Sequence, residues 1–373
     1  MEVRFFDLSA FDKKLYPQFM ESLSGVIGKS HFIKGLELQN FETEFSKRFQ
    51  HKNTIGVGNG LDALTISIKA LKLPQDSEII VPANTFAATA LAVTQAGHKI
   101  RLCEINPKTG NIDPNRLKVC INENTSALIV VHLYGNPANM SEIKKALPSN
   151  IKIIEDNAQA VGAKYKNVFT GNLGDISATS FYPTKPLGCY GDGGAISSNN
   201  DAIAEYCRSY ANYGSRDKYI HEFPGVNSRL DEMQAAILNI KLAHYDEQLN
   251  LKAEIYKQYK AGLNSCEHLQ LIEPLEDTNS AFHLLLVKSP NRERLKNYLE
   301  DSGIQCLIHY PIPLNKQPAL RDSLFESDRN MPITESFCDQ ILSLPFYPGL
   351  DENSVHYVCE KIKKFETNHR EST

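Results

Sequence analysis

Two stretches of the chain decide the fold: residues 151–159 read Ile-Lys-Ile-Ile-Glu-Asp-Asn-Ala-Gln, and residues 177–188 read Ser-Ala-Thr-Ser-Phe-Tyr-Pro-Thr-Lys-Pro-Leu-Gly. Each begins as a short apolar or β-rich run and continues into polar residues, a pattern that predicts a strand followed by a loop. The acid Asp156 therefore follows the predicted strand 151–155, and Lys185 follows the next one, 177–181.

Similar runs alternate with helical patterns from about residue 50 to residue 200. They predict further strands at 54–57, 79–81, 100–104 and 128–132. Most of these runs are continuously apolar, which is typical of strands covered on both faces. The pattern predicts an α/β fold with a mostly parallel central sheet and helices on both of its faces. Ligands are then expected at the carboxyl ends of the strands.

The pattern changes after a helical region that spans about residues 228–261. Short strands at 268–272 and 281–287 and a helix at 291–301 predict a smaller α+β domain. We therefore expect a large domain over residues 15–245 and a small domain over residues 246–373, to which the amino-terminal segment 1–14 also belongs.

The composition excludes several classes of protein. The formal charge of the 373 residues is −4, which offers no basic surface for nucleic acid. No run approaches the roughly 20 apolar residues that cross a bilayer, and the first residues lack the apolar core of a signal peptide, so no membrane association and a cytoplasmic location are expected. The eight cysteines form no Cys-x-x-Cys pair and predict neither a metal site nor disulfides.

Lys185 lies between Pro183 and Pro186, so its backbone is irregular and fixed in place. Such a lysine can form a Schiff base with pyridoxal phosphate, and a carboxylate can keep the ring nitrogen of that cofactor protonated. Asp156 would be this carboxylate, and Gln159 would face the phenolic oxygen of the cofactor from the same turn. The alternatives are a surface lysine and an acid that caps a helix.

The segment Gly58-Asn59-Gly60-Leu61 ends one predicted strand where a helix begins. Free backbone N–H groups at the positive end of the helix dipole could bind a phosphate there, although a plain turn has the same pattern. Ser180 could bind the same phosphate, and Phe86 could lie over the face of a planar cofactor. Both residues also fit ordinary packing or strand-end roles.

With these residues in place, the chain resembles the pyridoxal-phosphate sugar-nucleotide aminotransferases of the DegT/StrS type, which have the fold type I architecture of aspartate aminotransferase. The resemblance covers nearly the whole chain. Its motifs appear in family order: Phe6-Asp7-Leu8, Gly58 through Leu64, Asn84-Thr85-Phe86, His132 through Gly135, Glu155 through Gln159, Ser180 through Gly194, Asn212-Tyr213-Gly214, Asn227 through Ala236, and His309 through Pro313.

The resemblance implies a role for each cofactor-binding residue. Lys185 would bind the cofactor covalently and act as the proton carrier, whereas the related sugar 3-dehydratases carry histidine at this position. Asn227 would reach the phosphate of the neighbouring subunit's cofactor, so a homodimer with shared sites is expected. The other implied contacts are Asp156 to the pyridine nitrogen, Gln159 to the hydroxyl, Phe86 to the ring face, and Gly60, Leu61 and Ser180 to the phosphate.

The motifs around His132 and His309 most resemble the members that aminate C-3 of a dTDP-3-keto-6-deoxyhexose. The expected reaction moves an amino group from L-glutamate to that carbon and gives a dTDP-3-amino-3,6-dideoxyhexose. Ala87 and the pair Leu314-Asn315 depart from those members. The nearest alternative is an aminotransferase for a 4-keto sugar nucleotide, and a more distant one is a non-catalytic regulatory protein of the same fold.

Three residues are candidates for contacts with the substrate. Tyr182 and His309 could touch sugar hydroxyls, and Arg229 could hold a carboxylate or a phosphate. His309 could instead satisfy a hydrogen bond within its loop. Arg229 could likewise form a structural ion pair with Asp231 or Glu232.

Overall fold

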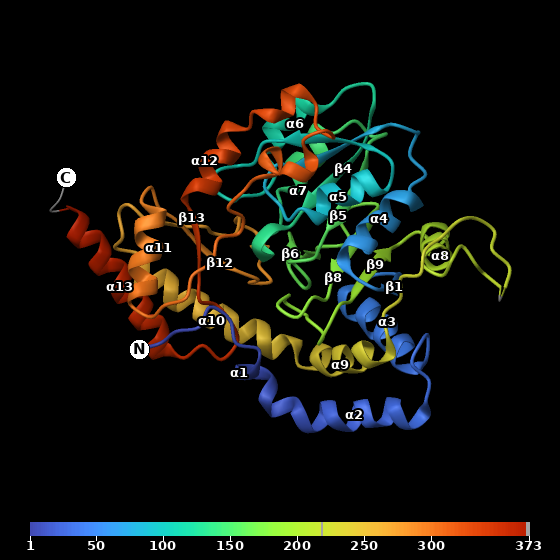
Figure 1. Ribbon diagram of the computed structural model, residues 1–373, viewed down its shortest axis with the longest axis horizontal. Coiled ribbons are helices and arrows are strands. Elements are labelled where there is room, and N and C mark those ends of the chain that lie inside the picture. The colour runs from blue at the N-terminus through green and yellow to red at the C-terminus, as the bar shows by residue number, and fades with distance from the viewer. Residues whose placement is uncertain (218, 371–373) are drawn as a thin grey trace.

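The computed structural model describes residues 1–217 and 219–370 (Figure 1). Its centre is a seven-stranded sheet in the order β1-β9-β8-β5-β4-β2-β3. The strands from β8 to β3 pair in parallel, whereas β9 is antiparallel to both β1 and β8, so the predicted mostly parallel sheet is confirmed. The strands are β1 (Asn53–Val57), β2 (Glu78–Pro82), β3 (Lys99–Cys103), β4 (Thr125–Val131), β5 (Lys152–Asp156), β8 (Ile176–Ser180) and β9 (Gly194–Ser198).

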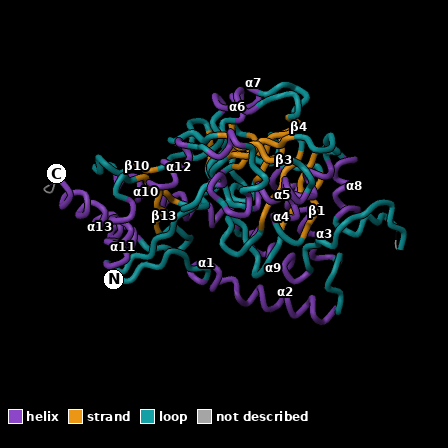
Figure 2. Tube along the Cα trace, turned by 45° about the horizontal axis from the view of Figure 1, so that its top comes forward, coloured by secondary structure: helices purple, strands orange, loops and turns teal. Residues whose placement is uncertain are grey.

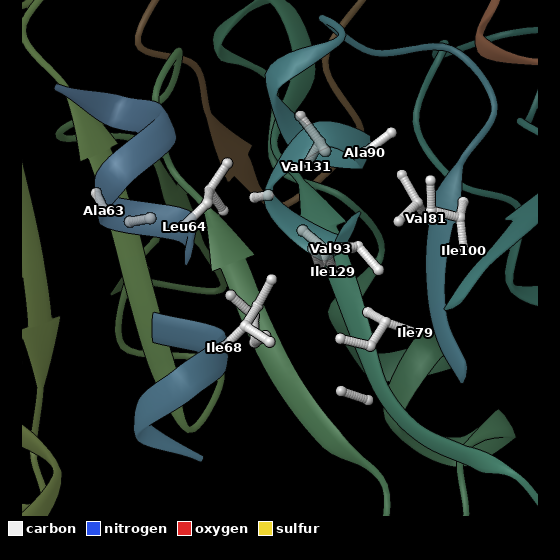
Figure 3. Packing of buried hydrophobic residues seen from close by; sticks show 14 of the residues in the cluster. Ala63, Leu64, Ile68, Ile79, Val81, Ala90, Val93, Ile100, Ile129 and Val131 are labelled. Carbon is white, nitrogen blue, oxygen red and sulfur yellow. The ribbon is translucent and has the colours of Figure 1, made fainter. Parts of the chain in front are cut away.

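Both faces of this sheet are covered because alternate strand residues enter different apolar clusters. On β2, Ile79 and Val81 belong to one cluster and Ile80 to another. Figure 3 shows the first cluster, where Leu64 and Ile68 face the sheet. Each such buried side chain contributes roughly 1.5–3 kcal/mol. The covering helices are α4 (Gly60–Ala70), α5 (Ala88–Gln95) and α8 (Asp201–Tyr210) on this face, and α3 (Leu36–Phe49), α6 (Pro114–Cys120), α7 (Met140–Ala146) and α9 (Glu232–Ala243) on the other.

A second sheet, in the order β10-β12-β13, lies with the carboxyl-terminal helices at one end of the molecule (Figure 2). Val3 pairs with Ile304 and belongs to the same apolar cluster as the second sheet and the carboxyl-terminal helices. The amino-terminal segment therefore packs on this end of the molecule. The division into domains at residue 245 stays a prediction. The elements are β10 (Gln270–Leu271), β12 (Leu285–Lys288), β13 (Ile341–Leu344), α10 (Tyr245–Leu263), α11 (Arg292–Asp301) and α13 (Glu352–Arg370).

Shorter elements connect these parts. They are α1 (Ser9–Asp12), α2 (Tyr16–Lys29), α12 (Pro332–Gln340), β6 (Lys164–Tyr165), β7 (Val168–Phe169), β11 (Thr278–Asn279), and 3₁₀ helices at Lys13–Leu15, Leu133–Gly135, Leu314–Lys316, Pro318–Leu320 and Glu326–Arg329. Within the described ranges, no helix is long and apolar enough to cross a membrane.

The prediction and the structure differ at three elements. Strand β9 was not predicted, because Gly194-Ala195-Ile196-Ser197-Ser198 contains only two apolar side chains besides glycine. The helical region 228–261 is two helices, α9 and α10, which meet at His244. The predicted strand 281–287 begins only at Leu285, because the backbone N–H groups of Ala281 and His283 bond to Gly135 and Tyr134 instead of to a neighbouring strand.

Candidate active site

The carboxyl ends of the central strands meet at one edge of the sheet, as the sequence pattern predicted. Asp156 is the last residue of β5, and Ser180 is the last residue of the adjacent strand β8. The segment after β1 leads into α4 at Gly60, next to Ser180. The structure therefore brings together residues that lie more than 100 positions apart in the sequence.

The amino terminus of α4 and the end of β8 lie close together and form a cradle. A Cβ atom on Gly60 would lie 2.7 Å from Cβ of Ser180, so only glycine allows this close approach. The side chain of Asn59 accepts a hydrogen bond from the backbone N–H of Asp62 and caps the helix. The N–H groups of Gly60 and Leu61 have no partner among the described residues, and they lie at the positive end of an 11-residue helix. This cradle fits a phosphate group.

Asp156 is buried and oriented by two donors. Thr89 Oγ1 donates to Oδ2 at 2.9 Å, and the backbone N–H of Ala158 donates to Oδ1 at 3.2 Å. Burial raises the pKa of this carboxyl, although both hydrogen bonds and the nearby charge of Lys185 oppose the rise. Each carboxylate oxygen keeps a further lone pair, so Asp156 can accept one more proton donor, such as a protonated ring nitrogen.

Lys185 lies on a tight loop. Its backbone N–H bonds to the carbonyl of Tyr182 at 2.8 Å, a turn in which Pro183 presets the backbone. A Cβ on Gly188 would lie 2.4 Å from the carbonyl oxygen of Pro183, so the loop closes only with glycine there. The Lys185 amine has no hydrogen-bond partner among the described residues. Burial lowers its pKa to about 8, against the opposing effect of the Asp156 charge.

Gln159 forms part of a hydrogen-bonded network with two tyrosines. Its Oε1 accepts from the backbone N–H of Tyr134 at 2.7 Å, and its Nε2 donates to the hydroxyl of Tyr310 at 3.0 Å. The Tyr134 hydroxyl receives a bond from Asn84 and donates to the carbonyl of His309. The second N–H of Gln159 Nε2 stays available for a ligand oxygen.

Phe86 follows β2 and is 57% exposed, which is unusual for a phenylalanine in a well-packed fold. Its ring centroid lies 5.8 Å from that of Tyr310. An exposed ring at the same edge as Lys185 fits a contact with the face of a planar ligand. The residues at this edge thus fit pyridoxal phosphate: a phosphate cradle, a carboxylate, an amide, a ring and an unpartnered amine.

Two of the residues predicted to contact the substrate, Tyr182 and His309, differ in their exposure. Tyr182 is 53% exposed beside the Lys185 loop. The side chain of His309 is half-buried, and its Nδ1 lies 2.9 Å from Oγ of Ser343, so its hydrogen-bond partner is on β13 and not within its own loop. Burial lowers the pKa of His309 to about 4 and keeps the ring neutral.

Arg229 and Asn227 lie in the segment that precedes α9. Within the described ranges, Arg229 forms no ion pair with Asp231 or Glu232, and its guanidinium lies 5.9 Å from the ring centre of Tyr213. Glu232 instead accepts bonds from three backbone N–H groups at the start of α3. Asn227 is exposed, in a short bridge with Asn212.

Sequence reasoning missed three residues of this site. Thr89 and Tyr310 contact Asp156 and Gln159, and the backbone N–H of His283 bonds to the carbonyl of Tyr134. Burial lowers the pKa of His283, and the charge of Lys185 lowers it further. Thr89 lies in the first turn of α5, three positions after the Asn84-Thr85-Phe86 motif already singled out. Tyr310 is adjacent to His309 in a motif already singled out. His283 had no local signal, because it comes from a distant part of the chain.

A buried hydrogen bond between His132 and Glu155 lies next to Asp156 in the sequence. His132 Nε2 lies 2.8 Å from Glu155 Oε2, and its Nδ1 accepts the backbone N–H of Ala138, which makes Nε2 the donor. Glu155 also accepts the N–H groups of Gly171, Leu173 and Gly174. Burial favours a higher pKa for Glu155, but these hydrogen bonds outweigh it and lower the pKa.

Comparison with known proteins agrees with this geometry. The profile of the DegT/DnrJ/EryC1/StrS aminotransferase family matches residues 14–363. The dTDP-3-amino-3,6-dideoxy-alpha-D-galactopyranose transaminase of Aneurinibacillus thermoaerophilus is 40% identical, with 97% of this chain and 99% of the relative covered. A pleiotropic regulatory protein of Geobacillus stearothermophilus is 39% identical, with 98% and 99% covered. The crystal structure of Streptomyces venezuelae DesV with a ketimine intermediate superposes with a TM-score of 0.94 at 36% identity, over 98% of both chains.

Proposed function

Because the chain belongs to the DegT/DnrJ/EryC1/StrS aminotransferase family and is a pyridoxal-phosphate-dependent sugar-nucleotide aminotransferase, we propose that its substrate is a dTDP-3-keto-6-deoxyhexose. L-Glutamate would donate the amino group, and the product would be a dTDP-3-amino-3,6-dideoxyhexose. The sugar assignment is supported by transaminases of dTDP-3-amino sugars that are 36% and 40% identical to this chain.

The observation that carries the proposal is the unpartnered amine of Lys185 beside the buried carboxylate of Asp156. With a pKa of about 8, this amine is partly unprotonated near neutral pH. It can therefore act as a general base that removes the proton from the amino-bearing carbon of the donor, and then as a general acid that gives this proton to a neighbouring atom. Pyridoxal phosphate, when bound, supplies the electron sink that makes this carbon acidic.

The other residues of the site would hold and orient the cofactor. Asp156 would hold the proton of the ring nitrogen, and Thr89 would fix the orientation of its carboxylate. Gln159 would donate to the phenolic oxygen through its free N–H. The phosphate would bind to the backbone of Gly60 and Leu61 and to the hydroxyl of Ser180, and Phe86 would cover the ring.

A homodimer with shared sites is part of the proposal. It is supported by the exposure of Asn227 and by apolar side chains on α2, where Met20 and Ile27 are 67% and 56% exposed. Mixing Lys185→Ala with Asn227→Asp subunits tests it, because mixed dimers would contain one intact site. Activity that reappears on mixing supports shared sites, and two inactive proteins that stay inactive after subunit exchange contradict them. A cytoplasmic location likewise stays a prediction.

Two other functions remain to be tested against this one. A 4-keto sugar nucleotide is favoured by the departures at Ala87 and Leu314-Asn315, and a non-catalytic role is favoured by the similarity to a regulatory protein. A non-catalytic protein has no need for the unpartnered Lys185 amine, so we favour the enzyme.

One spectroscopic experiment separates these functions. The protein is loaded with pyridoxal phosphate, converted with glutamate to the pyridoxamine form, and given a 3-keto or a 4-keto dTDP-6-deoxyhexose. Return of the aldehyde absorbance with only the 3-keto sugar supports the proposal. Return with only the 4-keto sugar overturns the sugar assignment, and no conversion by any amino acid supports the non-catalytic role.

A further inference from the structure

Two buried lysines line the cavity that also contains the Lys185 loop, and only one of them has an acidic partner. Lys241 on α9 lies 2.6 Å from Asp12, and both side chains are 3% exposed. Lys252 on α10 is 4% exposed, and its amine donates only to the backbone carbonyl of Phe282, at 2.7 Å. Within the described ranges, no carboxylate pairs with Lys252.

His283 is a second buried basic residue without a partner. It is 7% exposed, and its buried Nδ1 has no hydrogen-bond partner among the described residues. Its backbone N–H bonds to the carbonyl of Tyr134, the residue whose own N–H bonds to Gln159. Burial lowers the pKa of His283 far below its usual value, and the charges of Lys185 and Lys252 lower it further. Lys252 donates to the carbonyl of Phe282, the residue next to His283, and it lines the same cavity as Lys185, so the three basic residues belong to one region of the fold.

Buried cationic groups need an anion or must lose their protons. Lys241 has the carboxylate of Asp12, whereas burial lowers the pKa of Lys252 to about 7. Nδ1 of His283 stays without a partner, which costs free energy in a buried position. Lys252 and His283 are thus two buried basic groups without an acidic partner in the described ranges. Neither Gly60 nor Ser180 lines this cavity, so the phosphate cradle is a separate feature.

We propose that Lys252 and His283 bind a carboxylate of the amino-acid donor. The inference rests on the proposed function, because that reaction brings an amino acid to Lys185 in one half and a sugar ring without a carboxylate in the other. A permanent acid beside Lys252 would repel the donor, and a permanently charged lysine would stay unpaired when the sugar is bound. A buried basic pair without an acidic partner in the protein can bind the carboxylate of the donor, and it leaves no unpaired charge when the sugar is bound, because it can then lose its protons.

The alternative role of Lys252 is purely structural. Its bond to Phe282 supports a residue with a φ of 50°, in the left-handed region that a phenylalanine rarely adopts. In that case, replacing Lys252 would change stability and would weaken the two substrates alike. Binding measurements on separate ligands distinguish the two roles.

The test compares Lys252→Met and His283→Phe with Lys257→Met as a matched control. Lys257 lies on the same helix, α10, but is exposed and pairs with Glu254 at the surface. The glutamate concentration that half-saturates conversion of the pyridoxal form is measured by absorbance, and the affinities for glutarate, an unreactive dicarboxylate, and for dTDP are measured by calorimetry. We expect Lys252→Met and His283→Phe to weaken glutamate and glutarate about tenfold or more and to leave dTDP binding unchanged.

L-Alanine, which has only an α-carboxylate, identifies the group that is bound. A loss that is equal for alanine and glutamate assigns the α-carboxylate to Lys252, and a loss confined to glutamate assigns the side-chain carboxylate. Unchanged glutarate affinity in both variants, or an equal loss of dTDP affinity, overturns the inference even if the wild-type enzyme transaminates normally. Wild-type protein that binds glutarate but converts no amino acid overturns the proposed function instead.

Discussion

Replacing Lys252 with methionine should change the stability of the protein in a way that reverses with pH. In the folded protein, burial lowers the pKa of Lys252 from 10.5 to about 7. Between these two values the unfolded chain binds a proton that the folded protein does not, so the free energy of unfolding of the wild type rises with pH. The penalty is fully present below about pH 7 and absent above about pH 10.5.

The size of the effect follows from this shift. Each pKa unit corresponds to about 1.4 kcal/mol, so at about pH 6 Lys252 lowers the stability of the ligand-free protein by about 5 kcal/mol. The methionine variant escapes this penalty but leaves the carbonyl of Phe282 without its donor, which costs about 1–3 kcal/mol. We expect the variant to be more stable than wild type by about 2–4 kcal/mol at pH 6 and to lose about 3 kcal/mol of this advantage by about pH 9.5.

Urea unfolding of both proteins at several pH values, with equal cofactor content, measures this difference from the midpoints and slopes. Lys257→Met serves as the control, because its exposed amine should give a difference from wild type close to zero at each pH. A Lys252→Met difference that does not vary with pH would refute the argument, since it would mean that Lys252 keeps an ordinary pKa in the folded protein.

Three further substitutions test the site. Gly60→Ala places a Cβ 2.7 Å from Cβ of Ser180 and should weaken pyridoxal phosphate binding at least about tenfold, measured by equilibrium dialysis, with an unchanged circular dichroism spectrum. Asp156→Asn cannot hold the ring proton and should lower kcat roughly 10²–10⁴-fold while the cofactor still binds; a kcat near wild type would contradict this role. His132→Leu removes the donor to the buried carboxylate of Glu155 and should destabilise the protein by about 3–5 kcal/mol in urea unfolding, and a smaller loss than about 1 kcal/mol would argue against a stabilising bond to this carboxylate.

The sequence predicted the central strands because both faces of the sheet are covered, so their apolar runs are continuous. It did not predict β9, since the pairing of β9 between β1 and β8 depends on small residues that give no periodic signal. The predicted strand 281–287 includes residues 281–284, which are not in a strand in the structure. It is apolar, but its backbone bonds to Tyr134 and Gly135, a contact that depends on the tertiary fold.

The residues of the candidate site also form two groups: those that the local sequence pattern predicts and those that it does not. Residues at strand ends or helix starts, such as Asp156 and Gly60, follow from the local pattern, because parallel strands bring their ends to one edge. Tyr310 and His283 come from distant loops, and their contacts with Gln159 and Tyr134 depend on how those loops fold back over the sheet. The identities of Tyr310 and His283 do not show where these loops lie in the folded protein.

Lys241 and Lys252 show where local reasoning ends. Both lie on the long helical region that the sequence predicted, and both are buried in the same cavity. Lys241 is satisfied by Asp12, which comes from a segment more than 200 residues away, and Lys252 meets no acid in the described ranges. Natural proteins rarely bury a cation without a partner, because the desolvation cost is several kcal/mol. An enzyme that must accept two different substrates in turn has a reason to bear this cost, since the counter-ion can then arrive with one substrate and leave with its product.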